Sequence, residues 1–220
     1  MLTPDEMIQS ILARRDDADG VRTIDLLDFL FRGYPFDRIL PLLRSDNDDV
    51  AATGIWLVEE LGLRARPHLA LIAEFLGHRY WKVRYSAIDS ILSCGTPADW
   101  LVDLRAAELS TDEHPSVRWK AMNFLARLSQ ARVDACNTHS IEAGVAPAYA
   151  AGFALLCDVT ERGRAHARQL LTSGDQIQRT FAAAFAARVK AIDPSLVELA
   201  SKSQFEEVRR FGNDWLTSGE

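Results

Sequence analysis

A short motif recurs at a fixed spacing in the middle of this chain, and that spacing restricts the possible folds more than any other feature. Residues 81–88 read WKVRYSAI, and residues 115–122, 34 positions later, read PSVRWKAM. A weaker copy, DVAATGI, fills residues 49–55, 33 positions before the first motif. Periods of this length are typical of stacked helical hairpins. We therefore predict an all-α fold, a right-handed α-solenoid of about six helical hairpins.

The motif also predicts which face of the second helix in each hairpin is buried. Positions 0, 4, 5 and 8, counted from the valine of each copy, form one stripe along a helix. The small residue at position 4 allows neighbouring helices to approach closely. The residues of this predicted stripe are Val50, Gly54, Ile55 and Val58; Val83, Ala87, Ile88 and Ile91; and Val117, Ala121, Met122 and Leu125.

The segment that contains Val83, Arg84 and Ala87, together with its later copy, resembles the HEAT-repeat family and in particular its bacterial HEAT-like variant. The first copy departs from the family pattern, because Ala51 stands where the arginine is expected. The resemblance covers residues 36–129 and implies hairpins whose second helices line a concave surface. Arg84 and Arg118 are expected to act as struts between repeats that reach the caps of an adjacent turn.

The chain is predicted to be a single α-solenoid domain over residues 1–220, because no Gly/Ser-rich or charged linker interrupts it. Residues 1–35 are expected to form N-terminal capping helices, with Ile24 and Phe31 on an apolar face. Residues 36–129 hold the three clear repeats, and residues 130–220 hold weaker repeats and a C-terminal cap. The weaker repeats are anchored at equivalent positions by Pro147, Ala151 and Leu155; Ile177, Phe181 and Phe185; and Val208, Gly212 and Leu216.

The distribution of charge indicates the kind of partner. Residues 1–62 hold 13 Asp and Glu against 6 Arg, whereas residues 63–220 hold 18 against 19 Lys and Arg. The acidic N-terminal part disfavours binding to nucleic acid, which depends on cationic contacts with phosphates. It favours binding to a basic protein.

No run approaches the roughly 20 apolar residues that cross a bilayer. Three widely spaced cysteines are expected to be free thiols in a reducing compartment, so we predict a cytoplasmic protein, expected to be a monomer, with no membrane contact.

The positions left over after the buried stripe predict a surface that is aromatic and partly acidic. Large aromatic side chains flanked by polar groups are typical anchors of protein interfaces. The alternative is that Trp56, Tyr85 and Trp119 merely pack between repeats, and the sequence leaves both possibilities open. The predicted partner-binding residues are Trp56, Glu60, Tyr85, Asp89, Trp119 and Asn123.

No motif for catalysis, metal binding or cofactor binding stands out. Cys136 and His139 have the spacing of half a zinc site, but a structural site needs two further ligands in a recognisable pattern. The strongest argument for phosphate or nucleic acid is a basic cluster in one predicted helix, Arg162, Arg164, His166 and Arg168. We therefore predict no enzyme activity, no cofactor and no metal.

These observations favour a non-catalytic protein-binding module. Its sharpest version is a bacterial immunity protein of a toxin–antitoxin type, which would neutralise a basic toxin by occlusion. The alternatives are a regulatory scaffold or adaptor, and a HEAT-like enzyme that acts on nucleic acid or on a chromophore.

Overall fold

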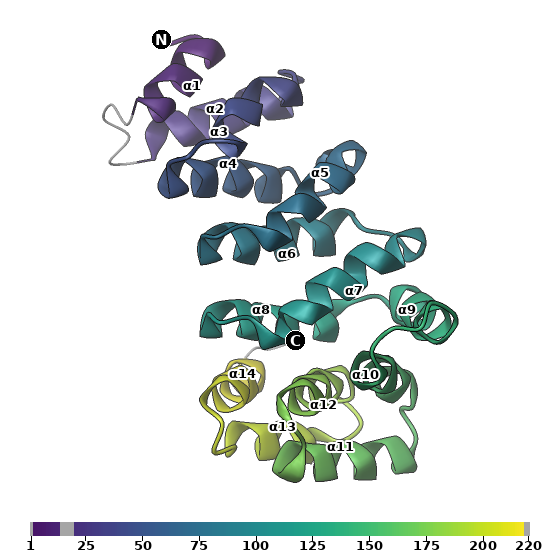
Figure 1. The fold of residues 1–220 in the computed structure, drawn as a ribbon. Coiled ribbons are helices and arrows are strands. Elements are labelled where there is room, and N and C mark those ends of the chain that lie inside the picture. The colour runs from purple at the N-terminus through teal and green to yellow at the C-terminus, as the bar shows by residue number, and fades with distance from the viewer. Residues whose placement is uncertain (1, 14–19, 218–220) are drawn as a thin grey trace. The chain divides into compact units, whose positions relative to one another are not determined.

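The computed structural model describes residues 2–13 and 20–217, and the regular secondary structure in these ranges is helical throughout (Figure 1). The predicted all-α solenoid class is confirmed, since short helices follow one another in hairpins. The chain divides into two compact units, Met1–Cys94 and Gly95–Glu220, and each has its own buried core. The predicted continuity of one domain stays a prediction. No helix in the described ranges has the length and hydrophobicity needed to span a membrane.

Unit 1 begins with a capping hairpin and continues with two repeat hairpins. Thr3 and Glu6 form the predicted capping box at the start of the first helix. Pro41 falls in the first turn of a short helix, where its missing N–H costs nothing. The helices of unit 1 are α1 Pro4–Leu12, α2 Val21–Phe31, α3 Leu40–Leu43, α4 Asp48–Leu61, α5 Leu69–Glu74 and α6 Trp81–Cys94, with 3₁₀ segments η1 Phe36–Ile39, η2 Gly62–His68 and η3 Phe75–Gly77.

The predicted buried stripe is confirmed on all three motif helices: α4, α6 and, in unit 2, α8 (Pro115–Arg127). Every residue of the stripe is buried. The small residue at position 4 has the predicted purpose on α4, because a Cβ at Gly54 would lie 2.9 Å from the backbone nitrogen of Leu43. The apolar pattern thus buries one side of each motif helix.

The repeated arginine closes the turn within its own hairpin. Arg84 Nη1 donates to the carbonyl oxygens of His78 and Arg79 at 2.8 and 3.0 Å. Arg118 does the same with the carbonyls of Asp112 and Glu113, at 2.8 and 3.0 Å. Arg118 also forms an ion pair with Glu207 in the first turn of α14, as expected of a strut that reaches an acidic helix start. The bonds to the carbonyls five and six positions earlier were not expected.

The same turn has a second recurring bond, in which the side chain that begins the turn accepts a backbone N–H two positions later. In unit 1, His78 Nδ1 accepts from the Tyr80 N–H at 3.0 Å. Other acceptors fill this position in neighbouring hairpins, namely Ser45 Oγ at 3.2 Å from the Asn47 nitrogen and Asp112 Oδ1 at 2.8 Å from the His114 nitrogen. The position requires a hydrogen-bond acceptor. The imidazole of His78 can accept there only while it is neutral.

This turn is expected to make unit 1 sensitive to acid. Burial lowers the pKa of His78 below its usual value of 6.5. The stability from the neutral imidazole is therefore fully present above about pH 6.5 and is lost as the pH falls through the lower pKa of the folded state. Replacing His78 by Asp should reduce the loss of unfolding free energy between pH 7.5 and pH 5.5, as measured by urea unfolding. An unchanged pH dependence in His78→Asp would contradict this account.

Unit 2 starts with one regular hairpin and then changes its arrangement. The helix α12 packs against α8, α10, α11, α13 and α14, so it lies at the centre of the others (Figure 1). Its residues 180–187 are all buried, which suits a helix that is apolar on every side. The helices of unit 2 are α7 Trp100–Glu108, α8 Pro115–Arg127, α9 Gln130–Glu142, α10 Pro147–Cys157, α11 Glu161–Ser173, α12 Gln176–Arg188, α13 Pro194–Ser201 and α14 Glu206–Thr217, with η4 Pro97–Asp99 and η5 Leu109–Thr111.

The central helix explains which of the weaker repeat anchors are correct. Phe181 and Phe185 on α12 are buried as predicted, and Val208 and Gly212 on α14 are buried too. Three other positions are exposed, so their prediction as equivalent buried anchors is wrong: Pro147, Ala151 and Leu216. α10 packs against α9 and α12 with a different face from the one that the repeat register predicts.

An ion pair lies inside unit 2, between α7 and α9. Arg132 donates to both carboxylate oxygens of Asp103, at 2.5 and 2.9 Å, and the two side chains are 5% and 0% exposed. Burial raises the pKa of Asp103, against the smaller lowering effect of the guanidinium. Arg132 also lies over the ring of Phe124, 5.7 Å from its centroid. A pair that is this deeply buried makes each charge dependent on the other.

Candidate functional site

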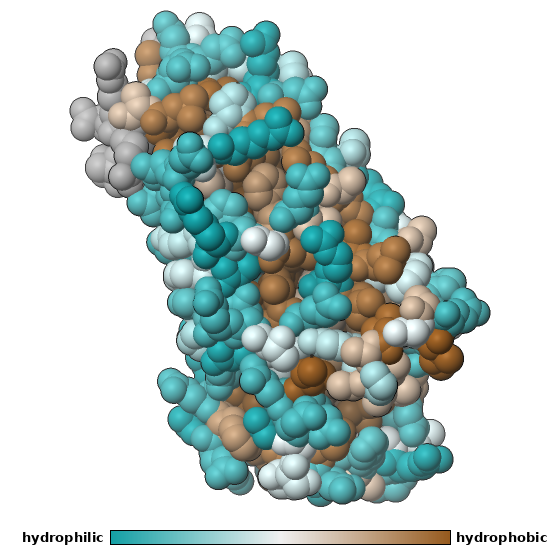
Figure 2. Space-filling model, in the orientation of Figure 1, coloured by the Kyte–Doolittle hydropathy of each residue, from teal (hydrophilic) through white to brown (hydrophobic). Residues whose placement is uncertain are grey.

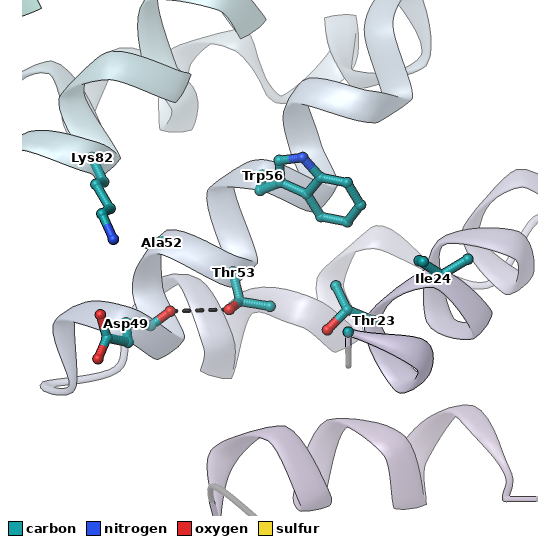
Figure 3. Close-up of a pocket in the computed structure, with 8 residues that line it drawn as sticks. Thr23, Ile24, Asp49, Ala52, Thr53, Trp56 and Lys82 are labelled. Atoms are coloured by element: carbon teal, nitrogen blue, oxygen red, sulfur yellow. Dashed lines mark hydrogen bonds between the residues drawn. The ribbon is translucent and has the colours of Figure 1, made fainter. Parts of the chain in front are cut away.

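A groove of about 520 Å³ opens in unit 1 between α2 and α4, with one side chain from α6 at its edge (Figure 3). We call it the Trp56 groove. Its apolar lining comes from Ile24 on α2 and from Ala52 and Trp56 on α4. The indole of Trp56 is half-buried, and one turn earlier the small Ala52 leaves space beside it. A large ring beside open space is suited to anchoring a side chain from a partner.

The start of α4 fixes the polar end of the groove. Asn47 caps the helix by accepting the backbone N–H groups of Asp49 and Val50. Thr53 donates its hydroxyl to the carbonyl oxygen of Asp49 at 3.0 Å, as Figure 3 shows. The hydroxyl of Thr53 is thereby occupied within the helix, and its methyl group is left for the groove.

One cation and one carboxylate, Lys82 and Asp49, stand at this polar end (Figure 3). Lys82 Nζ lies 5.6 Å from the ring centroid of Tyr80 and 5.9 Å from that of Trp81. Hydrogen bonding and charge attraction to Tyr80 raise the pKa of Lys82, and the charge of Asp49 adds to this effect. The ammonium group is therefore held over aromatic rings, with a carboxylate near it to offset its charge.

Four of the predicted partner-binding residues belong to the two neighbouring helices of this region, which pack against each other. Glu60 is exposed on α4, one turn after Trp56. On α6, Asp89 is half-buried, and the half-buried ring of Tyr85 meets that of Trp81 edge-on, with 6.4 Å between centroids. The structure thus places Trp56, Glu60, Tyr85 and Asp89 on α4 and α6 of one unit.

The remaining two predicted residues, Trp119 and Asn123, belong to α8 in unit 2. The ring of Trp119 meets that of Phe211 on α14 edge-on, with 6.4 Å between centroids. Its indole N–H is buried and has no hydrogen-bond acceptor among the residues that the structure describes. Asn123 is half-buried. Trp119 therefore makes the packing contact that the sequence left open as an alternative, and its role in binding stays a prediction.

The sequence prediction missed the contribution of α2 to the groove. It placed Ile24 and Phe31 on the buried face of the capping helix, but their side chains are 57% and 40% exposed. The buried face is formed instead by Thr23, Leu26 and Leu30, at spacings of three and four. This spacing was visible in the sequence, and it would have put Ile24 on the outer face.

The cysteines and the nearby histidine have contacts of their own. Cys136 Sγ lies 3.8 Å from the carbonyl oxygen of Trp100, and the ring of His139 stacks on that of Trp100. Burial raises the pKa of Cys136 to about 12, and burial with Asp134 raises that of Cys157 to about 11. Thiols with such pKa values are weak nucleophiles at neutral pH.

Figure 2 shows that polar side chains cover most of the face turned to the viewer and that apolar patches emerge between them. Two carboxylates near the start of α4 already have partners. Asp48 accepts from Arg79 Nε at 2.8 Å, and Asp49 accepts from the Tyr80 hydroxyl at 3.4 Å. Three further acidic residues of the acidic N-terminal part, Asp16, Asp17 and Asp19, lie outside the described residues. Within this unit, the Trp56 groove combines a depression, an aromatic ring and nearby carboxylates.

Comparisons with known proteins add evidence on the fold. No protein-family model and no curated protein matches this chain. Among solved structures it is similar to two engineered proteins, each with a TM-score of 0.50. The first has 14% sequence identity over 98% of this chain and 96% of that protein's chain. The second has 15% sequence identity over 97% of this chain and 67% of that protein's chain. A designed armadillo repeat protein in complex with the peptide (KR)4 has 15% identity over 98% of each chain and a TM-score of 0.49. At such identities, the likeness to the engineered proteins is one of fold alone.

Proposed function

We propose that this chain is a non-catalytic protein-binding module that receives its partner at the Trp56 groove. The observation that carries the proposal is the half-exposed indole of Trp56 beside open space, on a face shared by two packed repeat helices. Repeat folds of this kind bind proteins along an extended surface and need no catalytic residues. The HEAT-like motif fits the same role.

A basic partner fits the charges around the groove. Glu60 and Asp89 flank the aromatic residues, and the charge of Lys82 is partly offset by Asp49. Carboxylates on the same two helices would speed the encounter with a basic protein, and Trp56 would slow its release. The sharpest form of the proposal is a bacterial immunity protein that binds a basic toxin and covers its active surface.

The test is the affinity of recombinant variants for a partner that is isolated from native lysate and then purified. Replacing Trp56 by Ala should weaken binding by about 2 kcal/mol or more, roughly a thirtyfold rise in Kd, by isothermal titration calorimetry. Charge reversal of Glu60 and Asp89 should slow association and reduce its dependence on salt.

Leu63 provides a matched control, because it is 76% exposed on η2 and does not line the groove. Leu63→Ala should bind as the unmodified protein does. If Trp56→Ala keeps its circular dichroism spectrum and its Kd is unchanged, the groove is not the binding site. Recovery of a nucleic acid or of a bound chromophore in place of a protein would contradict the proposed class of function.

A further inference from the structure

A group of unpaired hydrogen-bonding side chains lies in unit 2 where α14 packs on α8, and the proposed function does not use it. Its members are Trp119 and Asn123, one turn apart on α8, and Arg210 on α14. The guanidinium carbon of Arg210 lies over the ring of Trp119, 5.9 Å from its centroid. We call these three residues the Trp119 cluster.

Each member of the Trp119 cluster has polar groups that the described part of the chain leaves unpaired. The indole nitrogen of Trp119 is buried and has no hydrogen-bond acceptor there. The half-buried amide of Asn123 and the exposed guanidinium of Arg210 make no hydrogen bond or ion pair with the described residues. A buried donor without an acceptor costs free energy, so a ligand that supplies an acceptor to the indole recovers this cost.

Packing fixes the indole, and two cations share its ring. The ring of Trp119 meets that of Phe211 edge-on, and Phe211 is itself buried. Lys120 Nζ lies over the same indole as Arg210, 5.7 Å from the ring centroid. An aromatic face attracts a cation, but it does not replace the acceptor oxygens that the five N–H groups of a guanidinium bind. The cluster therefore has a surplus of positive charge and of donors.

The acidic residues of the two helices leave this surplus in place. α8 holds three cationic residues and no Asp or Glu, namely Arg118, Lys120 and Arg127. On α14, the carboxylate of Glu207 is already paired with Arg118. Glu206 and Asp214 each stand four positions from Arg210, but neither forms an ion pair with it. An incoming anion therefore finds the guanidinium of Arg210 unneutralised.

We propose that the Trp119 cluster binds the carboxylate of an acidic side chain from a protein partner. The guanidinium of Arg210 donates two parallel N–H groups to the carboxylate oxygens. No polar bond holds Arg210 against the indole, so the bound carboxylate can draw it aside and accept the N–H of Trp119 and the amide of Asn123. An ionised carboxylate has about four acceptor sites, which is enough for all these donors. This selectivity for acidic segments is opposite to the one proposed for the Trp56 groove.

The test follows the indole N–H signals of the isotope-labelled full chain by nuclear magnetic resonance at about 0.15 M salt. The chain has five tryptophans, and Trp119→Phe, which keeps an aromatic ring on Phe211, identifies the signal of Trp119. A capped Gly-Glu-Glu-Gly peptide should move this signal downfield, because the N–H gains an acceptor. The matched Gly-Gln-Gln-Gly peptide should leave it in place.

Variants of the other two members measure their share of the binding. Arg210→Gln should raise the Kd of the glutamate peptide about tenfold, because it removes the charge and the paired donors. Asn123→Ala should raise it about threefold. Arg105→Gln is the matched control for Arg210→Gln and should leave the Kd unchanged, since Arg105 is exposed on α7 of the same unit and is not part of the cluster. Circular dichroism checks that each variant is folded.

Equal shifts with the two peptides, or equal effects of Arg210→Gln and Arg105→Gln, would overturn the proposal. A DNA oligonucleotide that moves the signal of Trp119 when the glutamate peptide does not would overturn it too, because the occupant would then be a phosphate. None of these readouts involves Trp56 or its groove, so failure here leaves the proposed function standing.

Discussion

Replacing Asp103 by Ala is expected to lower the free energy of unfolding by about 3–5 kcal/mol. The change leaves the guanidinium of Arg132 buried without its carboxylate, and the loss of hydration of that charge is then no longer offset. Urea unfolding followed by circular dichroism would measure the loss. A smaller loss than about 1 kcal/mol would show that water or another group takes over the role of the carboxylate.

The control removes both charges. Asp103→Leu combined with Arg132→Met replaces the pair by apolar side chains, and the methionine can still cover the ring of Phe124. Such replacements are often close to neutral, so the double variant should be more stable than Asp103→Ala by at least about 2 kcal/mol. If it is as unstable as the single variant, the position demands polar bonding rather than charge balance.

Gly163→Ala is expected to cost about 3 kcal/mol, because the added methyl group would overlap a backbone oxygen. Its Cβ would lie 1.7 Å from the carbonyl oxygen of Asp158, so the turn between α10 and α11 must open. Both helices pack on α12, and opening the turn disturbs those contacts. Thermal unfolding would show the loss.

Gly77 is the matched control for this glycine. It lies at the end of η3, and a Cβ there meets no heavy atom within 4 Å. Gly77→Ala should be neutral or slightly stabilising, since alanine reduces the freedom of the unfolded chain. If Gly163→Ala is as well tolerated as Gly77→Ala, the turn has room to adjust, and close packing is not what requires glycine there.

The fold was predictable wherever one helix face alone is buried. On α6, for example, Val83, Ala87 and Ile91 all lie in the core as predicted. The prediction failed where burial comes from several sides. α12 is apolar all round, and the register extended from the middle of the chain put the exposed Pro147 into the core. A period describes the contacts between neighbouring hairpins, but α12 contacts helices from distant parts of the sequence.

The candidate site was predictable only in part for a related reason. Trp56 and Glu60 follow from the repeat register, because they occupy positions that the buried stripe leaves over. Ile24 lies outside that register, and its place in the groove depends on how α2 packs on α4. Trp119 has the same register position as Tyr85, yet it meets Phe211, which comes 92 positions later in the chain.

The central position of α12 has a consequence for synthesis of the chain. Each hairpin of unit 1 finds its packing partners among its sequence neighbours, so this unit can become stable while the rest is still being translated. α8 must wait for α12, and Arg188 at the end of α12 bonds to the carbonyl of Leu128, 60 positions earlier. Until the ribosome has released that helix, the faces of α8 and α10 that pack on α12 stay uncovered, and exposed apolar surface of this kind favours aggregation.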